Sequence, residues 1–276
     1  MIPIEDHTGD VISKAQRGLG LTNAMLMEKA GITQAQLRAL KSGEFNEEAL
    51  RRVAPVLKLD ADALVELGRG SWYPQQPGEI DGFRMFTTPY GSMTVNACLV
   101  WDKESRKAVV FDTGADARPI LKAAEELGVS IELILITHAH EDHVADLKRL
   151  LAKTGAKAYV NVREQAEEDF PKGVETFSAG QSFVLGRLRI ESVLTSGHSP
   201  GQTTYIVKGL ERLVAVVGDS LFAGSIGGGL VSFADQYRND RERILTLPDD
   251  TVIAPGHGPL TTVGEEKAHN PFFARS

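Results

Sequence analysis

The chain has 276 residues, with 30 Lys and Arg against 37 Asp and Glu, and its formal net charge is −7. Hydrophobic residues make up 42% and charged residues 24%, which excludes a disordered or fibrous chain. No apolar run reaches the ~18 residues that span a membrane, and Met1–Asp10 lacks the pattern of a signal peptide. The single cysteine, Cys98, cannot form an intrachain disulfide. We therefore expect a cytoplasmic protein without membrane contacts.

Residues 1–70 have the pattern of short helices. Thr33 with Gln36 forms a capping box before an apolar helical segment, and Asn46 and Asp60 precede two more such segments. Leucine and valine recur at helical spacings and predict a small core. These features predict an all-α N-terminal domain.

A stretch rich in Gly, Pro and polar residues, 71–78, predicts a linker. Strands then alternate with helices over 79–276, which predicts a larger domain of the α/β class. Strands are predicted at Phe83–Thr88, Thr94–Trp101, Ala108–Asp112, Ile131–Ile136, Ala158–Val160, Leu188–Leu194, Thr203–Val207, Leu213–Val217 and Thr251–Ala254. Helices are predicted at Arg118–Leu127, Asp142–Lys153 and Asp235–Leu247.

Residues 137–143 read THAHEDH and directly follow a predicted buried strand. His138 and His140 are two residues apart, so both imidazoles project from the same side of an extended segment. Asp142 begins the next predicted helix, where a carboxylate is favoured, and His143 lies in its first turn. The motif therefore gathers four metal-competent side chains at one strand-to-helix corner.

Three more metal-competent side chains follow predicted strands downstream. His198 lies in TSGHSPGQ, Asp219 ends LVAVVGD and His257 ends TVIAPGH. Each has a glycine beside it, which lets other backbone segments approach closely. Together with the THAHEDH motif, these residues predict a metal site at the ends of several core strands.

These motifs resemble those of the metallo-β-lactamase-fold hydrolases, and the resemblance extends from about Phe83 to Phe273. The phrases GHSPGQT, GDSLFAGSIG and PGHGPLTTVGEEKAHNPFF are most similar to the glyoxalase II-like (hydroxyacylglutathione hydrolase-like) branch. The resemblance implies an αββα sandwich with two metals at the edge of the sheets. In this chain the sandwich would follow the small helical domain.

The resemblance also implies two divalent metal ions and a ligand assignment. It assigns His138, His140 and His198 to the first metal, Asp142, His143 and His257 to the second, and Asp219 as the bridge. Nitrogen and oxygen ligands suit zinc, and they also accommodate iron or manganese. Asp112, in FDTG, is similar to the family's aspartate that orients metal ligands.

Charge then indicates the chemistry. Two divalent ions exceed the charge of the carboxylates of Asp142 and Asp219, and the remaining positive charge stabilises a bridging hydroxide near neutral pH. The hydroxide would attack the carbonyl of a small-molecule ester or thioester, so both aspartates are predicted catalytic residues. An iron-dependent persulfide-type dioxygenase is the alternative enzyme, because it keeps the ligands of the first metal.

Departures from the family leave the substrate open. Glyoxalase II proper places basic and tyrosine side chains for glutathione in the loop that here reads Gly227–Leu230. The persulfide dioxygenases carry an arginine in that loop, and this chain has none there. The lactonase branch has a tyrosine just after the bridging aspartate, where this chain has Phe222.

The N-terminal segment ITQAQLRALKSGEF resembles a helix-turn-helix of the phage-repressor type. Its recognition helix would present four side chains to DNA: Gln34, Gln36, Arg38 and Lys41. Residues 1–70, however, contain nine Lys and Arg against ten Asp and Glu, a balance of −1 that is unfavourable for phosphate contacts. We expect no retention of duplex DNA at physiological salt, and a structural, substrate-covering or homodimerising role instead. A DNA-binding regulator with a metallo-hydrolase-like sensing domain is the alternative.

Overall fold

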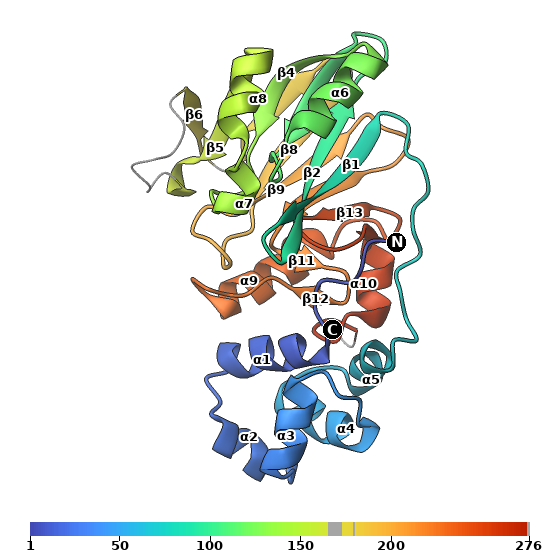
Figure 1. Ribbon diagram of the computed structural model, residues 1–276, viewed down its shortest axis with the longest axis vertical. Coiled ribbons are helices and arrows are strands. Elements are labelled where there is room, and N and C mark those ends of the chain that lie inside the picture. Colours follow the sequence, from blue (N-terminus) through green and yellow to red (C-terminus); the bar gives the residue numbers. More distant parts are fainter. Residues whose placement is uncertain (165–172, 179, 275–276) are drawn as a thin grey trace.

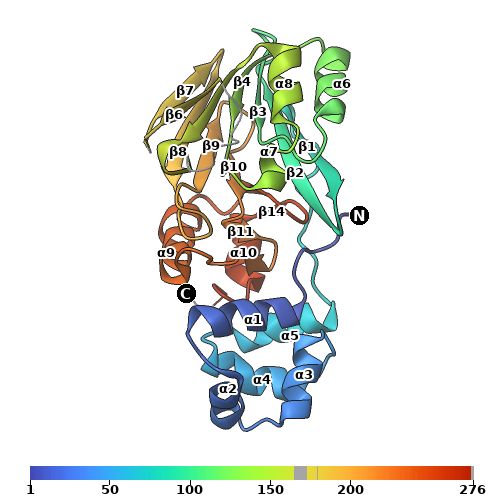
Figure 2. The same cartoon turned by 60° about the vertical axis from the view of Figure 1, so that its left-hand side comes forward.

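Two β-sheets face each other, with helices on their outer sides and a group of helices at one end (Figures 1 and 2). The computed structural model describes residues 1–164, 173–178 and 180–274. This architecture confirms the predicted α/β sandwich and the helical N-terminal region. Within the described residues, no helix combines the length and apolar character needed to cross a membrane.

The first sheet follows the chain order. Its described strands are β1 (Phe83–Tyr90), β2 (Met93–Trp101), β3 (Lys107–Phe111), β4 (Ser130–Leu135), β5 (Lys157–Asn161) and β6 (Val174–Phe177). The first three pair antiparallel, whereas β3 to β6 are parallel. Helices α6 (Arg118–Leu127) and α8 (Leu147–Thr154) pack on its outer face. Because β3 and β4 are parallel, their carboxyl ends lie side by side.

The second sheet is mostly antiparallel. Its described strands, in spatial order, are β14 (Thr261–Thr262), β13 (Val252–Pro255), β10 (Val214–Gly218), β9 (Thr203–Lys208), β8 (Leu188–Leu194) and β7 (Ser182–Leu185). Only the β10–β13 pair is parallel among the described strand pairs of this sheet. Phe111 of the first sheet and Tyr205 and Val216 of the second are buried in the core between the sheets.

Further short elements surround one end of the sandwich. They are α7 (Glu141–Val144), a 3-10 turn (Val162–Glu164), β11 (Leu221–Phe222), β12 (Ser225–Ile226), α9 (Phe233–Asn239), a π-helical segment (Asp240–Ile244) and α10 (Val263–His269). These elements and the ends of β4, β10 and β13 surround the side chains discussed below.

The N-terminal region is helical, as predicted. Its helices are α1 (Thr8–Gly18), α2 (Asn23–Ala30), α3 (Gln34–Lys41), α4 (Glu47–Val56) and α5 (Ala61–Arg69). The predicted caps are confirmed: Thr33 and Gln36 form the capping box of α3, and Asn46 and Asp60 cap α4 and α5. Helix α1, which was not predicted, is capped by the ring of His7.

These helices share one buried cluster with the second half of the chain. Leu50 and Leu64 belong to the same cluster as Val217, Leu221 and Phe273. The helices therefore pack on one another around this cluster, which continues into the second half of the chain. The division of the chain at residues 70 and 78 stays a prediction.

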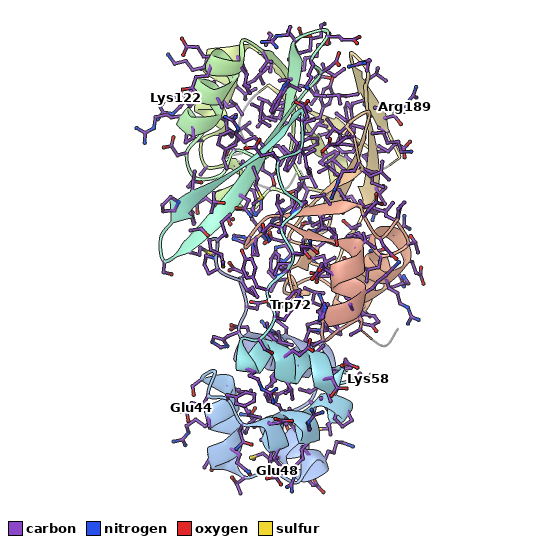
Figure 3. The ribbon with its side chains drawn as sticks, turned by 90° about the vertical axis from the view of Figure 1, so that its right-hand side faces the viewer. Glu44, Glu48, Lys58, Trp72, Lys122 and Arg189 are labelled. Carbon is purple, nitrogen blue, oxygen red and sulfur yellow. The ribbon has the colours of Figure 1, made fainter. Side chains whose placement is uncertain are left out.

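The segment predicted as a linker contacts the second half of the chain. Trp72 lies at this junction (Figure 3), where its indole N–H donates to Glu265 at 3.0 Å and its ring stacks on His269. The Tyr73 hydroxyl donates to the carbonyl of Ile2 at 2.8 Å. Residues 71–78 are thus held in place by side-chain contacts.

Several predicted elements were wrong in detail. The helix expected over 142–153 is divided into α7 and α8, with Asp146 between them accepting a hydrogen bond from the Ala117 N–H at 2.9 Å. The helix expected over 235–247 becomes π-helical after Asn239. The strand expected to end at Asp112 ends one residue earlier, because Asp112 has a φ of 56°. Strands β6, β7 and β14, the β11–β12 hairpin and helices α1 and α10 were not predicted.

The shared cluster predicts a single unfolding transition. Leu64 is fully buried, so Leu64→Ala should lower the free energy of unfolding by about 2–5 kcal/mol. Leu230→Ala, at an exposed leucine, should change it by less than about 0.5 kcal/mol. Denaturant unfolding followed by circular dichroism and by tryptophan fluorescence measures both. Two separate transitions, with only one shifted by Leu64→Ala, would contradict the shared core.

Candidate metal centre

Asp112 organises the loop that carries the THAHEDH motif. Its carboxylate accepts hydrogen bonds from the Thr137 backbone N–H and hydroxyl, both at 2.7 Å, and lies 2.8 Å from Nδ1 of His143. Asp112 follows β3 and Thr137 follows β4, so the parallel pairing of these strands brings them together. Asp112 thus orients the imidazole of His143. It also holds Thr137, the residue directly before His138.

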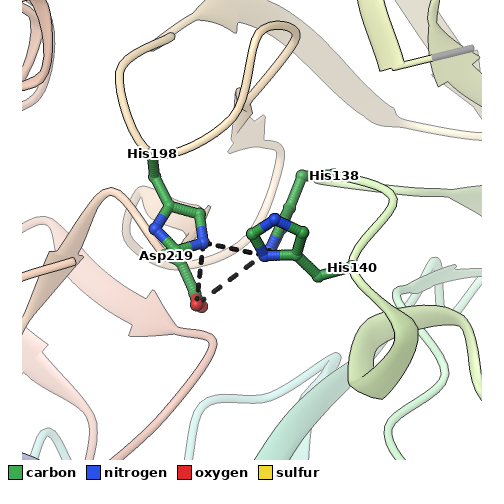
Figure 4. A group of neighbouring side chains, drawn as sticks. All are labelled: His138, His140, His198 and Asp219. Atoms are coloured by element: carbon green, nitrogen blue, oxygen red, sulfur yellow. Dashed lines mark hydrogen bonds and ion pairs between the residues drawn. The ribbon is translucent and has the colours of Figure 1, made fainter. Parts of the chain in front are cut away.

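Four side chains form the first ligand group: His138, His140, His198 and Asp219. Nδ1 of His140 lies 3.0 Å from Nε2 of His138 and 2.9 Å from Nε2 of His198, and Asp219 Oδ2 lies 3.4 Å from the latter atom (Figure 4). Ligands around a tetrahedral zinc ion are about 3.3 Å apart, given metal–nitrogen distances near 2.0 Å. The spacing of this group is therefore close to that of a metal site.

Three side chains form the second ligand group: Asp142, His143 and His257. Nε2 of His257 lies 3.3 Å from Asp142 Oδ2 and 3.4 Å from Asp219 Oδ2. Nε2 of His143 lies 3.2 Å from the other oxygen of Asp219. The Asp219 carboxylate therefore lies between the two groups.

The donor atoms of the two groups are better placed to bind a pair of cations than to form hydrogen bonds with one another. Nε2 of His143 and Oδ1 of Asp219 are buried and face each other without the geometry of a hydrogen bond. Buried polar atoms without a partner are rare, because leaving them unpaired costs about 1–3 kcal/mol each. Gly256 leaves this space open, since a Cβ there would clash with Asp219 and with the ring of His143. A bound cation would satisfy these atoms.

Hydrogen bonds hold the second nitrogen of four imidazoles. Nδ1 of His257 lies 2.6 Å from the Thr94 carbonyl, and Nδ1 of His198 lies 2.9 Å from that of Gly228. Nδ1 of His143 faces Asp112, as described, and Nδ1 of His138 lies 3.1 Å from the Thr137 hydroxyl. A proton on each Nδ1 leaves Nε2 as the metal-binding atom, which is how partners around a metal orient its histidines.

The two ligand groups differ in the pKa values of their histidines. Burial alone would raise the pKa of Asp219, but the charges of His143 and His257 hold it well below its ordinary value. Burial opposes protonation of both these histidines, and yet Asp219 and its neighbours raise the pKa of His143 to about 10 and that of His257 to about 11. In the first group, burial lowers the pKa of His138 and His198. Without metal, protons therefore occupy the second group.

Glu164 is a site residue that the sequence analysis missed. Its Oε2 accepts from the Ala139 N–H at 2.9 Å, and its Oε1 accepts from the Ser199 hydroxyl and the Gly201 N–H, both at 2.5 Å. Ala139 lies between His138 and His140, and Ser199 follows His198. This one carboxylate therefore joins the two loops of the first group. No motif connects it to them in the sequence.

The residues predicted to contact DNA lie on α3, away from the metal-ligand groups (Figure 1). The Gln36 side chain accepts from the Thr33 N–H, and the Lys41 ammonium donates to Asn23 at 2.9 Å. Gln34 and Arg38 are exposed. Two of the four side chains are thus engaged within the helical region, and their contact with DNA stays a prediction.

Comparison with known families identifies the superfamily of the chain. The model of the metallo-beta-lactamase superfamily matches residues 90–257, so the chain belongs to this superfamily. All seven predicted ligands and Asp112 lie inside the match. The match begins after the N-terminal helices and does not bear on the helix-turn-helix resemblance.

Individual relatives and solved structures are similar to about two thirds of this chain. Hydroxyacylglutathione hydrolase GloC of Haemophilus influenzae is 31% identical over 210 residues, which cover 67% of this chain and 95% of that protein. The BLEG-1 B3 metallo-beta-lactamase has a TM-score of 0.58 at 29% identity, covering 68% of this chain and 99% of the other. TTHA1623 in a di-iron-bound form has a TM-score of 0.56 at 26% identity, covering 68% of this chain and all of the other.

Replacing Glu164 should weaken the first ligand group selectively. In Glu164→Gln an amide nitrogen replaces one of the two carboxylate oxygens. The group that donates a hydrogen bond to that oxygen loses its acceptor, so one of the two loops that Glu164 joins moves. We expect metal affinity at the first group to fall about 10- to 100-fold while the second group retains its metal. Titration with Co²⁺, followed by absorption, resolves the two groups. The control is Glu175→Gln, an exposed residue of β6. Equal losses at both groups would contradict this role.

Metal uptake should release protons mainly from the second group. His143 and His257 hold protons up to a pH of about 10 and 11, so a cation must displace them. Affinity at the second group should therefore rise from pH 6 to pH 8, whereas the first group, with neutral His138 and His198, should change less. Calorimetry in buffers of different ionisation enthalpy counts the protons. Equal proton release at both groups would contradict the charge difference.

Proposed function

We propose that this protein is a metal-dependent hydrolase that binds two divalent ions and cleaves an acyl bond of the ester or thioester type. The observation that carries the proposal is the position of Asp219 between the two ligand groups, within 3.4 Å of nitrogens of His143, His198 and His257. A carboxylate in contact with both groups is the arrangement of a two-metal site.

Zinc is the metal we propose, with iron and manganese as the alternatives that the donors also allow. The two groups offer imidazole nitrogens and carboxylate oxygens, which zinc, iron and manganese all accept. The related TTHA1623 structure is of a di-iron-bound form, and this favours testing iron beside zinc. In this proposal His138, His140 and His198 hold one ion, Asp142, His143 and His257 hold the other, and Asp219 contacts both.

The residues of this chain would hold and orient the reacting groups. Two bound ions supply a nucleophile from water at neutral pH and polarise a substrate carbonyl. Asp219 and Asp142 would balance part of the positive charge of bound ions, and Asp219 would contact both ligand groups. Asp112 fixes the ring of His143 through Nδ1 at 2.8 Å, and Glu164 fixes the loops of the first group.

The relatives support an acyl thioester as the substrate class. The Haemophilus influenzae relative bears the name of a hydroxyacylglutathione hydrolase, which acts on a thioester. The Gly227–Leu230 loop lacks the basic and tyrosine side chains expected for glutathione, so we propose a thioester or ester with another thiol or alcohol part. We also propose a cytoplasmic location, in keeping with the single buried cysteine.

For the N-terminal helices we propose a covering role rather than DNA binding. Their buried cluster continues into the second half of the chain, and their Lys41 and Gln36 side chains are engaged in local hydrogen bonds. The near-neutral balance of residues 1–70 agrees with this role.

The test combines metal counting with turnover. Purified protein should contain about two transition-metal ions per chain and hydrolyse at least one member of a panel of acyl thioesters, lactones and phosphodiesters. Asp219→Ala should lose both ions and turnover, because the shared carboxylate is gone. His257→Ala should empty mainly the second group and leave a partly active enzyme. Asp250→Ala, at an exposed aspartate, is the control.

Three outcomes would contradict the proposal or part of it. Purified protein without a stoichiometric amount of bound metal would contradict the two-metal hypothesis. Two ions per chain in Asp219→Ala would contradict the shared role of this carboxylate. Oxygen consumption with persulfides, without hydrolysis of thioesters, would instead establish the iron-dependent dioxygenase.

A further inference from the structure

Helix α9 lies between the N-terminal helices and the end of the sandwich that carries the ligand groups (Figures 1 and 2). Its Phe233 packs on α1, where a Cβ at Gly18 would lie 2.1 Å from the phenyl ring. One turn later, the ring of Tyr237 stacks on that of Phe273, with ring centres 5.2 Å apart. Aromatic contacts therefore hold this helix in place.

Gln236, a residue of this helix, binds the main chain beside the shared carboxylate. Its amide nitrogen donates to the carbonyl of Asp219 at 3.3 Å and to that of Ser220 at 2.8 Å. The amide therefore uses both of its hydrogens on this segment. Gly227 permits this approach, since a Cβ there would lie 1.8 Å from the Asp219 carbonyl oxygen and 3.0 Å from the Gln236 amide nitrogen.

A carboxyl group four residues later holds the side chain of the same segment. Asp240 is fully buried, and it accepts a hydrogen bond from the Ser220 hydroxyl at 2.5 Å. Ser220 directly follows Asp219 in the chain. The residue next to the shared carboxylate is therefore fixed through both its main chain and its side chain.

The same glutamine borders the loop that carries His198. A Cβ at Gly197, the residue before this histidine, would lie 2.4 Å from the Gln236 Cβ. Asn239 also binds this loop, since its side-chain amide donates to the Ser196 carbonyl at 2.8 Å. Helix α9 therefore contacts the main chain beside two of the predicted ligands at once.

The amide oxygen of Gln236 indicates that packing alone does not account for this residue. The side chain is fully buried, and its Oε1 has no hydrogen-bond partner among the residues that the structure describes. Unpaired buried oxygens are rare because they are costly, and an apolar side chain of similar size would avoid this cost. What the glutamine adds over such a side chain is the pair of hydrogen bonds that its Nε2 donates.

We propose that Gln236 is a positioning residue of the candidate metal centre, which holds the main chain of Asp219 so that its carboxylate reaches both ligand groups. The inference rests on the proposed function, because it requires that both groups bind metal. The Asp219 carboxylate lies within 3.4 Å of imidazole nitrogens from both groups. A shift of its main chain therefore changes the donor spacing in both groups. Glu164, in contrast, joins the loops of the first group alone.

Gln236→Met tests this role, because methionine has a similar length and shape and no N–H group to donate. Co²⁺ titration of the metal-free, full-length protein, followed by absorption, measures the affinity of each group. We expect the affinity of both groups to fall about tenfold, a loss typical of removing a partner that orients metal ligands. Glu164→Gln should weaken the first group only, so the ratio of the two affinities distinguishes the two residues.

Gln16→Met is the matched control. Gln16 is a buried glutamine of α1 whose Nε2 donates to the Leu21 carbonyl at 3.0 Å and to Asn23 at 2.9 Å. Its Oε1 also lacks a partner within the described part of the chain. Both substitutions should lower the stability of the metal-free protein, but only Gln236→Met should lower Co²⁺ affinity and shift the absorption bands of bound Co²⁺, which report the arrangement of its ligands.

Gln236→Asn keeps the amide but is one carbon shorter, so it should also weaken both groups, and it decides the matter if Gln236→Met does not fold. Unchanged affinities in a folded Gln236 variant would overturn the inference, as would a loss confined to one group or an equal loss in Gln16→Met. Wild-type protein that binds no Co²⁺ would overturn this inference together with the two-metal hypothesis. Failure to hydrolyse any acyl substrate, with the affinities changed as expected, would overturn only the proposed acyl hydrolysis.

Discussion

The structure depends on one buried carboxylate that must be shared. Asp219 follows β10, is 6% exposed, and meets imidazoles from three different loops. An isolated charge at such a place would be too costly to bury, so the surrounding cations or protons are a condition of the fold as well as of any reaction. The remaining features of this end of the sandwich position groups around it: the parallel β3–β4 pair, the turn at Asp112 and the open space at Gly256.

The sequence permitted prediction of the side chains that cluster at the candidate metal centre, because local geometry determines the position of most of them. Spacing of two residues aligned His138 with His140, and strand ends placed His198, Asp219 and His257 at one edge of the sheets. The predicted fold class followed from alternating strands and helices and is confirmed by the two sheets. Short elements were missed, since β14 has two residues and little periodicity to reveal it.

Glu164 and the N-terminal helices show what local pattern cannot reveal. Glu164 contacts its partners across 25 to 37 positions, and an acidic residue at a strand end is common without such a role. Helical spacing identified the buried leucines of the first 70 residues, yet it did not indicate that they share a cluster with Val217 and Phe273. An amphipathic pattern indicates that one face of a helix is buried. Only the tertiary structure shows which residues bury that face.

The position of the amino end has a practical consequence for work with this protein. A Cβ at Gly258, the residue after His257, would lie 3.2 Å from the Glu5 backbone nitrogen, so this end of the described chain lies close to the candidate metal centre. An affinity tag of consecutive histidines at this end would add imidazoles within reach of the ions and compete with the native ligands. Metal counts and ligand affinities are therefore best measured on protein that carries no histidine tag at this end.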